Sequence, residues 1–282
     1  MKKIITLLLA LTLALTLAGC GQKGNEDGGE PAEDRTITVG VNPVPHAEIL
    51  ENAVKSVLKE AGWDLEVVVY QDYVLPNENL VAGELDANYF QTLGYMYGQN
   101  DSHGWNLTAV KGVHIEPMGL YSDKYTDATQ IPDGASISVP NDEDNRTRAL
   151  EFLIANGFLN AIEGELSAAT INGNAEANPH GYEIVELEAA QLPLALVDVD
   201  ASVINGNYAL GAGLPASHPA LLVEEFDDET AIRRTNFIVV TAGNENSEKI
   251  QALVAAITSE EVQKFIEDTY TGAVITSFVD PQ

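Results

Sequence analysis

One stretch of the chain has residues that could hold an anion. It runs from Val139 to Arg148, and its pattern predicts a strand that leads into a helix with Asp144 as the N-cap. The helix would bury three apolar side chains, those of Leu150, Leu153 and Ile154. Arg148 lies in the first turns, where two parallel hydrogen bonds from its guanidinium could hold a carboxylate near the positive end of the helix dipole. The alternative is a surface arginine that pairs with one of the chain's many carboxylates.

The other reactive residues form no catalytic motif. The chain has no G-x-S-x-G elbow, no H-E-x-x-H pair, no Walker A loop and no G-x-G-x-x-G after a strand. His114 and Glu116 alternate on a predicted strand and could face the same side, but two ligands are too few for most divalent ions. A metal site assembled in space is less expected than core or solvated histidines for the five in the chain, His46, His103, His114, His180 and His218. We predict no catalytic residue, no metal and no cofactor.

The composition narrows the class of protein. The 282 residues include 43 acidic and 14 basic side chains, for a formal net charge of -29, and 45% of them are hydrophobic. This is a globular composition, with enough length for one large domain or two modest lobes. Nucleic acid is excluded as a partner, since phosphate binding needs clustered Lys and Arg. The single cysteine excludes an intramolecular disulfide and a cysteine-based zinc site.

The amino-terminal segment is typical of an exported lipoprotein. Two lysines precede an apolar stretch, Ile4 to Ala18, that is too short to span a bilayer as a helix. The following Leu17-Ala18-Gly19-Cys20 resembles the bacterial lipoprotein cleavage box. We therefore predict a signal peptide over residues 1–19 and lipidation of Cys20. A plain signal peptide with an incidental cysteine is the alternative.

A tether is expected to follow the anchor. Residues 20–35 contain almost no apolar side chain, so they cannot bury surface to offset the entropy of ordering. Two or three acyl chains on Cys20 would hold the protein stably on the membrane, whereas one chain would not. We expect a lipid-anchored protein on the extracytoplasmic face of the cell membrane, with no membrane-spanning segment.

The rest of the chain alternates between strand and helix patterns. Thr36 to Val41 predicts a strand, and apolar residues from Leu50 to Leu58 recur at helical spacing before Gly62, a helix stop. Further strands are expected at Leu65–Tyr70, Asp86–Phe90, Leu107–Lys111, Met118–Tyr121, Ser136–Val139, Glu183–Leu187, Ala201–Ile204 and Phe237–Val240. Two helical stripes follow, from Ile250 and from Val262. This order predicts an α/β protein with mostly parallel sheets covered by helices.

Several stretches resemble one known family. They are VPHAEIL at 44–50, GELDANYFQ at 83–91, HIEPMGLYS at 114–122, LEAAQLP at 187–193 and the segment from Ala201 to Tyr208. In order and spacing they are similar to the NlpA/MetQ family, the methionine-binding lipoproteins of ABC importers. The resemblance implies a type II periplasmic-binding-protein-like fold, with two α/β lobes, two hinge strands and the ligand in the cleft between the lobes. Lobe 1 would comprise 36–117 and 239–282, and lobe 2 would comprise 118–238.

The resemblance also implies which residues hold the ligand. Three aromatic residues would surround the ligand side chain, an arginine would bind its carboxylate, and two asparagines would hold its amino and carboxylate groups. These are, in that order, Tyr73, Phe90 and Tyr95, then Arg148, then Asn205 and Asn236. Without the resemblance each aromatic would be taken as a core residue. Asn205 has independent support, because it follows a predicted parallel strand, where open α/β sheets bind ligands.

The expected function is the capture of L-methionine or a related amino acid and its delivery to the permease and ATPase of an ABC importer. Thr92 stands where the family usually has His, and Arg233-Arg234 replace its usual Pro-Tyr. A methionine derivative, a short Met-containing peptide or another apolar amino acid therefore stays open as the ligand. Alternatives from other classes are a hydrolase or metal-dependent enzyme on the same fold, and a structural lipoprotein with an empty cleft.

Overall fold

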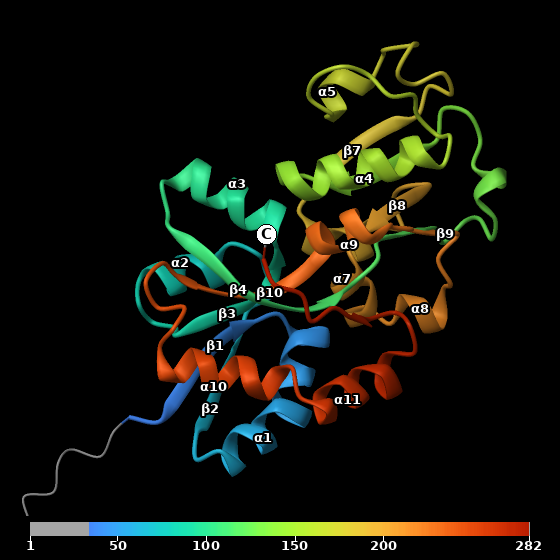
Figure 1. Cartoon of the computed structure of the whole chain (residues 1–282). Coiled ribbons are helices and arrows are strands. Elements are labelled where there is room, and N and C mark those ends of the chain that lie inside the picture. The colour runs from blue at the N-terminus through green and yellow to red at the C-terminus, as the bar shows by residue number, and fades with distance from the viewer. Residues whose placement is uncertain (1–33, 282) are drawn as a thin grey trace, which may run out of the picture. The chain divides into compact units, whose positions relative to one another are not determined.

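A computed structural model describes residues 34–281 of the chain. The predicted signal peptide, Cys20 and nearly all of the predicted tether lie outside the described residues. Within the described part, no helix combines the length and the apolar character needed to cross a membrane. The described residues form two β-sheets with helices packed on them (Figure 1).

The larger sheet has six strands in the order β11-β4-β10-β3-β1-β2. Their bounds are β1 Thr36–Val41, β2 Asp64–Val69, β3 Ala87–Thr92, β4 Leu107–Ile115, β10 Thr235–Thr241 and β11 Ile275–Thr276. β1 runs parallel to β2 and β3, whereas β10 is antiparallel to both β3 and β4.

The smaller sheet has five strands in the order β7-β6-β8-β5-β9. Their bounds are β5 Gly119–Tyr121, β6 Ser136–Pro140, β7 Glu183–Leu187, β8 Ala201–Ile204 and β9 Leu222–Val223. β6 is parallel to β7 and β8, and β5 is antiparallel to β8 and β9. The expectation of mostly parallel sheets is therefore wrong, and both sheets are mixed. The chain leaves the larger sheet after β4 and returns as β10, so the returning strand runs opposite to its neighbours.

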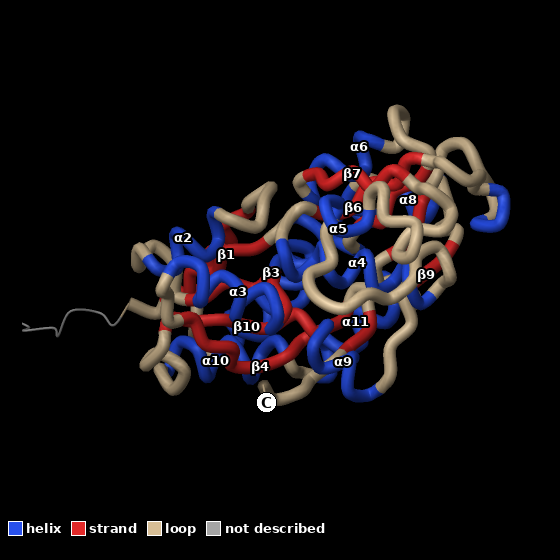
Figure 2. The backbone as a smooth tube through the Cα atoms, turned by 90° about the horizontal axis from the view of Figure 1, so that it is seen from above, coloured by secondary structure: helices blue, strands red, loops and turns tan. Residues whose placement is uncertain are grey.

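Helices join and cover the strands. The longer ones are α3 Leu93–His103, α4 Glu143–Ala155, α10 Glu248–Ile257 and α11 Glu260–Tyr270. Shorter ones are α1 Lys55–Glu60, α2 Leu75–Val81, α5 Ala168–Ile171, α6 Leu192–Ala195, α7 Gly206–Gly211, α8 Leu214–Ser217 and α9 Asp228–Arg234. Helical turns also occur at η1 Pro43–Ala47, η2 Leu50–Val54, η3 Ala128–Gln130 and η4 Ala189–Gln191. Figure 2 shows helices and loops surrounding the strands when the molecule is seen from above.

The apolar cores lie on both faces of the larger sheet. In β10 the side chains of Ile238 and Val240 join the cluster under α10 and α11, while Phe237 and Val239 join the cluster under α2 and α3. This alternation follows from the two-residue period of a strand, and it explains why the middle of β10, from Phe237 to Val240, is apolar on both faces. A separate cluster packs α4 against the smaller sheet. Each sheet therefore has apolar cores of its own. The boundaries of the two lobes stay a prediction.

The start of α4 differs from the sequence-based prediction. Asp142, with an extended backbone, is the N-cap, and its side chain accepts a hydrogen bond from the backbone N–H of Asn145 at 3.0 Å. The predicted cap, Asp144, lies inside the first turn. Both aspartates have the right side chain for a cap, and backbone geometry decides between them. The helix therefore begins two residues earlier, and Arg148 lies in its second turn.

Candidate functional site

A pocket that is partly open to solvent, with about 360 Å³ of empty space, lies among residues from segments of both sheets. Its lining comes from the loop between β2 and α2, the end of β3 and the start of α3, the segment after β4, the first turns of α4, the β8–α7 junction, and β10. The residues are Tyr73, Phe90, Gln91, Thr92, Tyr95, Glu116, Asn145, Arg148, Asn205, Gly206, Asn207 and Asn236. All six residues predicted to bind the ligand are in this set. The structure thus brings them together from segments up to 163 positions apart, the separation of Tyr73 and Asn236.

Three aromatic rings form the apolar part of the pocket. The ring centroid of Tyr73 lies 5.8 Å from that of Phe90 and 5.8 Å from that of Tyr95. The ring centroids of Phe90 and Tyr95 are 6.0 Å apart. The Tyr95 hydroxyl donates to the backbone oxygen of Tyr73 at 2.9 Å, and the Tyr73 hydroxyl donates to Asn207 Oδ1 at 2.6 Å. Because both phenol groups are already bonded within the protein, the rings offer a ligand mainly their apolar faces.

Arg148 is buried and already holds a carboxylate of the protein. Its Nε donates to both oxygens of Glu224, at 2.9 and 3.1 Å, and its Nη2 donates to Glu224 Oε2 at 2.5 Å. Nη2 also donates to the backbone oxygen of Glu116 at 2.9 Å. Among the described residues, Nη1 makes no hydrogen bond. One edge of the guanidinium is thus occupied, and the Nη1 group remains for a second acceptor.

The charge of this pair is secure at neutral pH. Burial lowers the pKa of Arg148, but the neighbouring Glu224 carboxylate more than reverses this and leaves the pKa above its ordinary value. Burial raises the pKa of Glu224, and the Arg148 guanidinium outweighs that effect, so the net pKa is lowered. Arg234, one of the residues that replace the usual Pro-Tyr, also lies 3.4 Å from Glu224. Sequence reasoning missed Glu224, because no pattern distinguishes it among 43 acidic residues.

Asn205 lies at the junction of β8 and α7, as predicted for a residue at the carboxyl end of a parallel strand. Its Nδ2 donates to Asn145 Oδ1 at 2.7 Å, while its Oδ1 is buried and has no partner among the described residues. The next residue is Gly206, where an added Cβ would lie 2.7 Å from the Glu116 Cβ. Glycine is therefore needed to bring this junction against the segment after β4.

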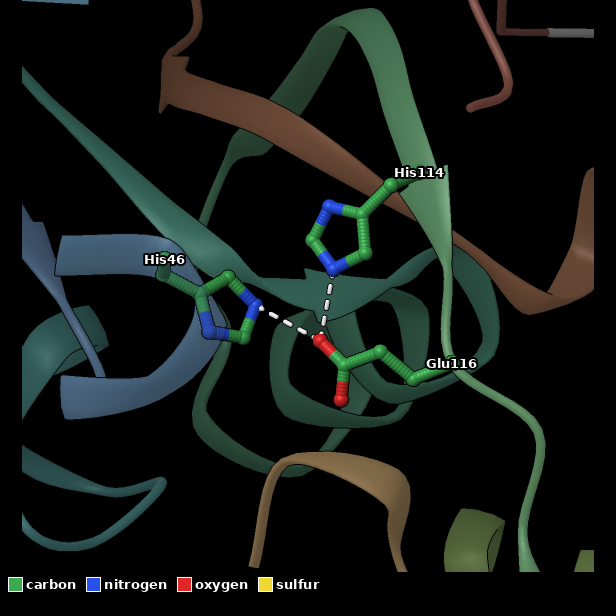
Figure 3. Close-up of side chains that lie close together, drawn as sticks. All are labelled: His46, His114 and Glu116. Carbon is green, nitrogen blue, oxygen red and sulfur yellow. Dashed lines mark hydrogen bonds and ion pairs between the residues drawn. The ribbon is translucent and has the colours of Figure 1, made fainter. Parts of the chain in front are cut away.

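Asn236 lies on β10 beside a cluster of two histidines and a glutamate. His46 Nε2 is 3.1 Å from Asn236 Oδ1 and 3.3 Å from Glu116 Oε1, and His114 Nε2 is 2.6 Å from the same Glu116 oxygen. Figure 3 shows both imidazole rings directed at that oxygen. The other nitrogen of His114, Nδ1, is hydrogen-bonded to the Tyr89 hydroxyl. All these side chains are at least nine-tenths buried.

Burial sets the protonation of this cluster. It lowers the pKa of His46 to about 4 and that of His114 to about 3, so both rings are neutral at pH 7. Burial also raises the pKa of Glu116, and this effect is opposed first by His46 and then by Arg148. Sequence reasoning placed His114 and Glu116 on one side of a strand but did not bring His46 to them. Its segment, η1, is about 70 residues away in the chain, and only the fold shows the contact.

The three side chains His46, His114 and Glu116 are of types that can bind a metal ion. Two ligands of a tetrahedral zinc ion, each about 2.0–2.2 Å from the metal, lie about 3.3 Å apart. The 2.6 Å between His114 Nε2 and Glu116 Oε1 is shorter than this and is the length of a hydrogen bond between charged and neutral partners. We therefore treat the cluster as a row of polar contacts, with a hydrogen bond between His114 and Glu116 and an electrostatic contact between Glu116 and His46.

Thr92 caps α3 at the wall of the pocket. Its side-chain oxygen accepts the backbone N–H of Tyr95 at 3.4 Å and donates to Asp144 Oδ2 at 3.3 Å. The residue that departs from the family pattern thus has a structural role of its own. Its small side chain lines the pocket where the family usually has an imidazole, and we expect it to leave more room at this wall.

Comparison with known proteins places the chain in a family. Residues 37–278 match the model of the NlpA lipoproteins. The membrane lipoprotein TpN32 of Treponema pallidum is 37% identical over 243 residues, 86% of this chain and 88% of the relative. The D-methionine-binding lipoprotein MetQ of Escherichia coli strain K12 is 34% identical over 268 residues, 94% of each chain.

A solved structure agrees with these relatives. It is a nutrient-binding protein from Burkholderia cenocepacia bound to methionine, which is 34% identical, with a TM-score of 0.76 over 86% of this chain and 100% of that one. The likeness confirms the predicted α/β fold of the two-lobed, type II binding-protein kind. The predicted family is confirmed as well, and this chain belongs to the NlpA lipoprotein family.

Proposed function

We propose that this protein captures methionine as a zwitterion and delivers it to an ABC importer, without a catalytic step of its own. The observation that carries the proposal is the division of the pocket into two ends. Aromatic rings line one end, and buried polar groups without a full set of partners line the other. Free α-amino acids with an apolar side chain have the same division. The methionine bound by the Burkholderia relative and the name of the E. coli relative support this choice.

The polar end would bind the two charges of the ligand separately. The Nη1 group of Arg148 and the amide of Asn236 are available for the carboxylate, and a charged pair of this kind is stronger than a neutral hydrogen bond. Asn205 Oδ1 is a buried acceptor without a donor, so it would gain a partner in the ligand's ammonium group. Glu116, with its carboxylate on the pocket wall, adds negative charge for the ammonium.

The apolar end would select the side chain. Zwitterion contacts are the same for every α-amino acid, so they supply affinity without selection. The rings of Tyr73, Phe90 and Tyr95 can surround an unbranched thioether, whose sulfur gains roughly 0.3 to 1.5 kcal/mol per aromatic contact. A side chain shorter by one methylene should lose about 1 to 3 kcal/mol. With Thr92 at the wall, we expect weaker discrimination than in relatives that have His there.

The test is calorimetric titration of protein stripped of bound ligand by unfolding and refolding. The ligands are L- and D-methionine, norleucine, leucine and valine. Methionine should bind most tightly, norleucine should follow within about 1 to 2 kcal/mol, and valine should be the weakest. Leucine or valine binding as tightly as methionine would refute the assignment. Turnover of any of these amino acids, or of a Met-containing peptide, would favour the enzyme alternative.

A further inference from the structure

Two buried rows of polar contacts lead to the pocket and end on its two asparagines; every link is a hydrogen bond except the 3.3 Å contact between Glu116 and His46. The shorter row leads from the cap of α4 to Asn205. The longer row leads from β3 to Asn236 on β10. The shorter row consists, in order of contact, of Asp142, Asn145 and Asn205. The longer row consists of Tyr89, His114, Glu116, His46 and Asn236.

The shorter row determines which end of the Asn205 amide faces the pocket. Asn145 Nδ2 donates to the Asp142 carboxylate at 3.0 Å, so the Asn145 oxygen is turned the other way. That oxygen can only accept, and it is met by Asn205 Nδ2 at 2.7 Å. The oxygen of Asn205 is consequently the end left without a partner among the described residues. Asn205 offers an acceptor.

The longer row has the opposite result at Asn236. His114 Nε2 lies 2.6 Å from an oxygen of the Glu116 carboxylate, which can only accept, so we place the proton of the neutral ring on this nitrogen, and Nδ1 then accepts from the Tyr89 hydroxyl. His46 Nε2 faces the oxygens of Glu116 and Asn236, both of which are acceptors in this arrangement. This nitrogen must therefore carry the single proton of the neutral ring, because a lone pair facing a carboxylate would be repelled and the other nitrogen, Nδ1, has no hydrogen-bond partner among the described residues. The proton holds the Asn236 oxygen away from the ligand and leaves Nδ2 as a donor.

We propose that Asn145 and His46 are positioning residues that turn the two ligand-binding amides in opposite directions, so that the pocket reads the polarity of an amino-acid zwitterion. By residue type the asparagines are equivalent, and each could bind either end of the ligand. Their buried neighbours remove this freedom. The ammonium group is directed to Asn205 and the carboxylate to Asn236 and Arg148. This inference rests on the proposed function, which it makes more specific.

The first test makes the same substitution at both asparagines. Asn236→Asp exchanges the free donor for an oxygen that faces the ligand carboxylate, so methionine affinity should fall by about 100-fold or more. Asn205→Asp exchanges the hydrogen bond to the Asn145 oxygen for a repulsion, but it keeps an oxygen facing the ammonium and adds a negative charge beside it, so the net loss should stay below about 10-fold. Calorimetric titration measures both. Equal losses, or a larger loss at Asn205, would overturn the inference.

The second test separates positioning from a merely structural role of His46. His46→Leu keeps the volume but removes the proton, and methionine affinity should fall by about 10-fold. His46→Gln places an amide donor near the position of Nε2, and it should recover most of the loss. In an Asn236→Ala background, His46→Leu should cost almost nothing more, because its effect passes through the missing amide. Additive losses in this double-mutant cycle would contradict the positioning role.

The outcomes also distinguish this inference from the function beneath it. A wild-type protein that binds methionine but responds equally to the two Asp substitutions would refute only the positioning. A wild-type protein that binds no amino acid would overturn both. If methionine binding requires added Zn²⁺ and is lost with EDTA, the inference is refuted. His46, His114 and Glu116 would then form a metal centre.

Discussion

At the scale of single residues, the pocket depends on one buried positive charge. The whole chain has a formal charge of -29, so at long range it repels a ligand carboxylate. The local attraction for the carboxylate must come from Arg148. Among the described lining residues, its Nη1 is the cationic group that has no hydrogen bond within the protein. Arg148→Ala should therefore weaken methionine binding by on the order of 2 to 5 kcal/mol, measured by calorimetry.

Arg146 is the matched control for this prediction. It lies on the same helix, but its guanidinium pairs with Glu165 at 2.7 Å and does not line the pocket. Arg146→Ala should change methionine affinity by less than about 0.5 kcal/mol. Because Arg148→Ala removes the nearest cation from the buried Glu224 carboxylate and leaves it only the more distant Arg234, the double variant Arg148→Ala, Glu224→Gln should regain thermal stability but not affinity. Equal affinity losses at positions 146 and 148 would show that Arg148 is not the ligand's partner.

The residues that touch the pocket were more predictable than those that support them. The six predicted residues came from a family resemblance carried by short motifs, and all six line one pocket. Glu224, Asn145 and His46 were missed, because each acts through a hydrogen bond to a residue far away in the chain. The types of these three residues are common, and their surroundings exist only in the folded protein.

At the scale of elements, the start of α4 links stability to binding. Asp142 caps the helix and also accepts from the Asn145 side chain, so a single carboxylate serves both the helix and the shorter row of hydrogen bonds. Asp142→Ala should lower the free energy of unfolding by about 1 kcal/mol, as for other lost caps, and should also weaken methionine binding. Chemical denaturation and calorimetric titration measure the two effects.

A cap far from the pocket provides the comparison. Ser247 caps α10 and accepts the backbone N–H of Ile250 at 3.4 Å, with no contact to the pocket lining. Ser247→Ala should lower stability by a similar amount, about 1 kcal/mol, and leave methionine affinity unchanged. If the two variants lose stability alike and neither loses affinity, Asp142 has no role beyond the helix.

The elements themselves were largely visible in the sequence, whereas their pairing was not. The predicted strands Thr36–Val41, Glu183–Leu187 and Ala201–Ile204 agree with β1, β7 and β8 to the residue. Strands such as these have strong local signals, in β-branched residues and turn-forming neighbours. The direction of β10 depends on how the chain crosses from one sheet to the other. That crossing is a property of the fold and leaves no periodic pattern.

At the scale of the whole molecule, the proposed role requires a membrane anchor that is separate from the pocket. The pocket lining lies between Tyr73 and Asn236, well away in sequence from Cys20. We expect Cys20→Ala to release the protein from washed membranes, because the acyl chains supply the anchoring energy. Methionine affinity should not change. Full retention of the variant in the membrane fraction would disprove lipidation at this residue.

The buried histidines should make the stability of the folded protein depend on pH. Their pKa values, about 4 for His46 and about 3 for His114, lie below the 6.5 expected in the unfolded chain. Between these values the unfolded chain binds protons that the folded protein excludes, so stability must decrease as the pH falls below 6.5. Each histidine contributes a slope of up to about 1.4 kcal/mol per pH unit. The raised pKa of Glu116 acts in the opposite direction and cancels part of this slope.

A comparison with His46→Gln isolates one histidine from the rest of the acidic chain. Protonation of the many surface carboxylates relieves their mutual repulsion in both proteins, so it cancels in the difference. Glutamine does not titrate, and the unfolding free energy of the variant should therefore fall less steeply between pH 6 and 4.5, by up to about 1.4 kcal/mol per unit. Urea denaturation at several pH values measures both slopes. Parallel curves would mean that His46 takes up a proton as readily in the folded protein as in water. That result would contradict its description as a buried neutral ring that donates to Asn236.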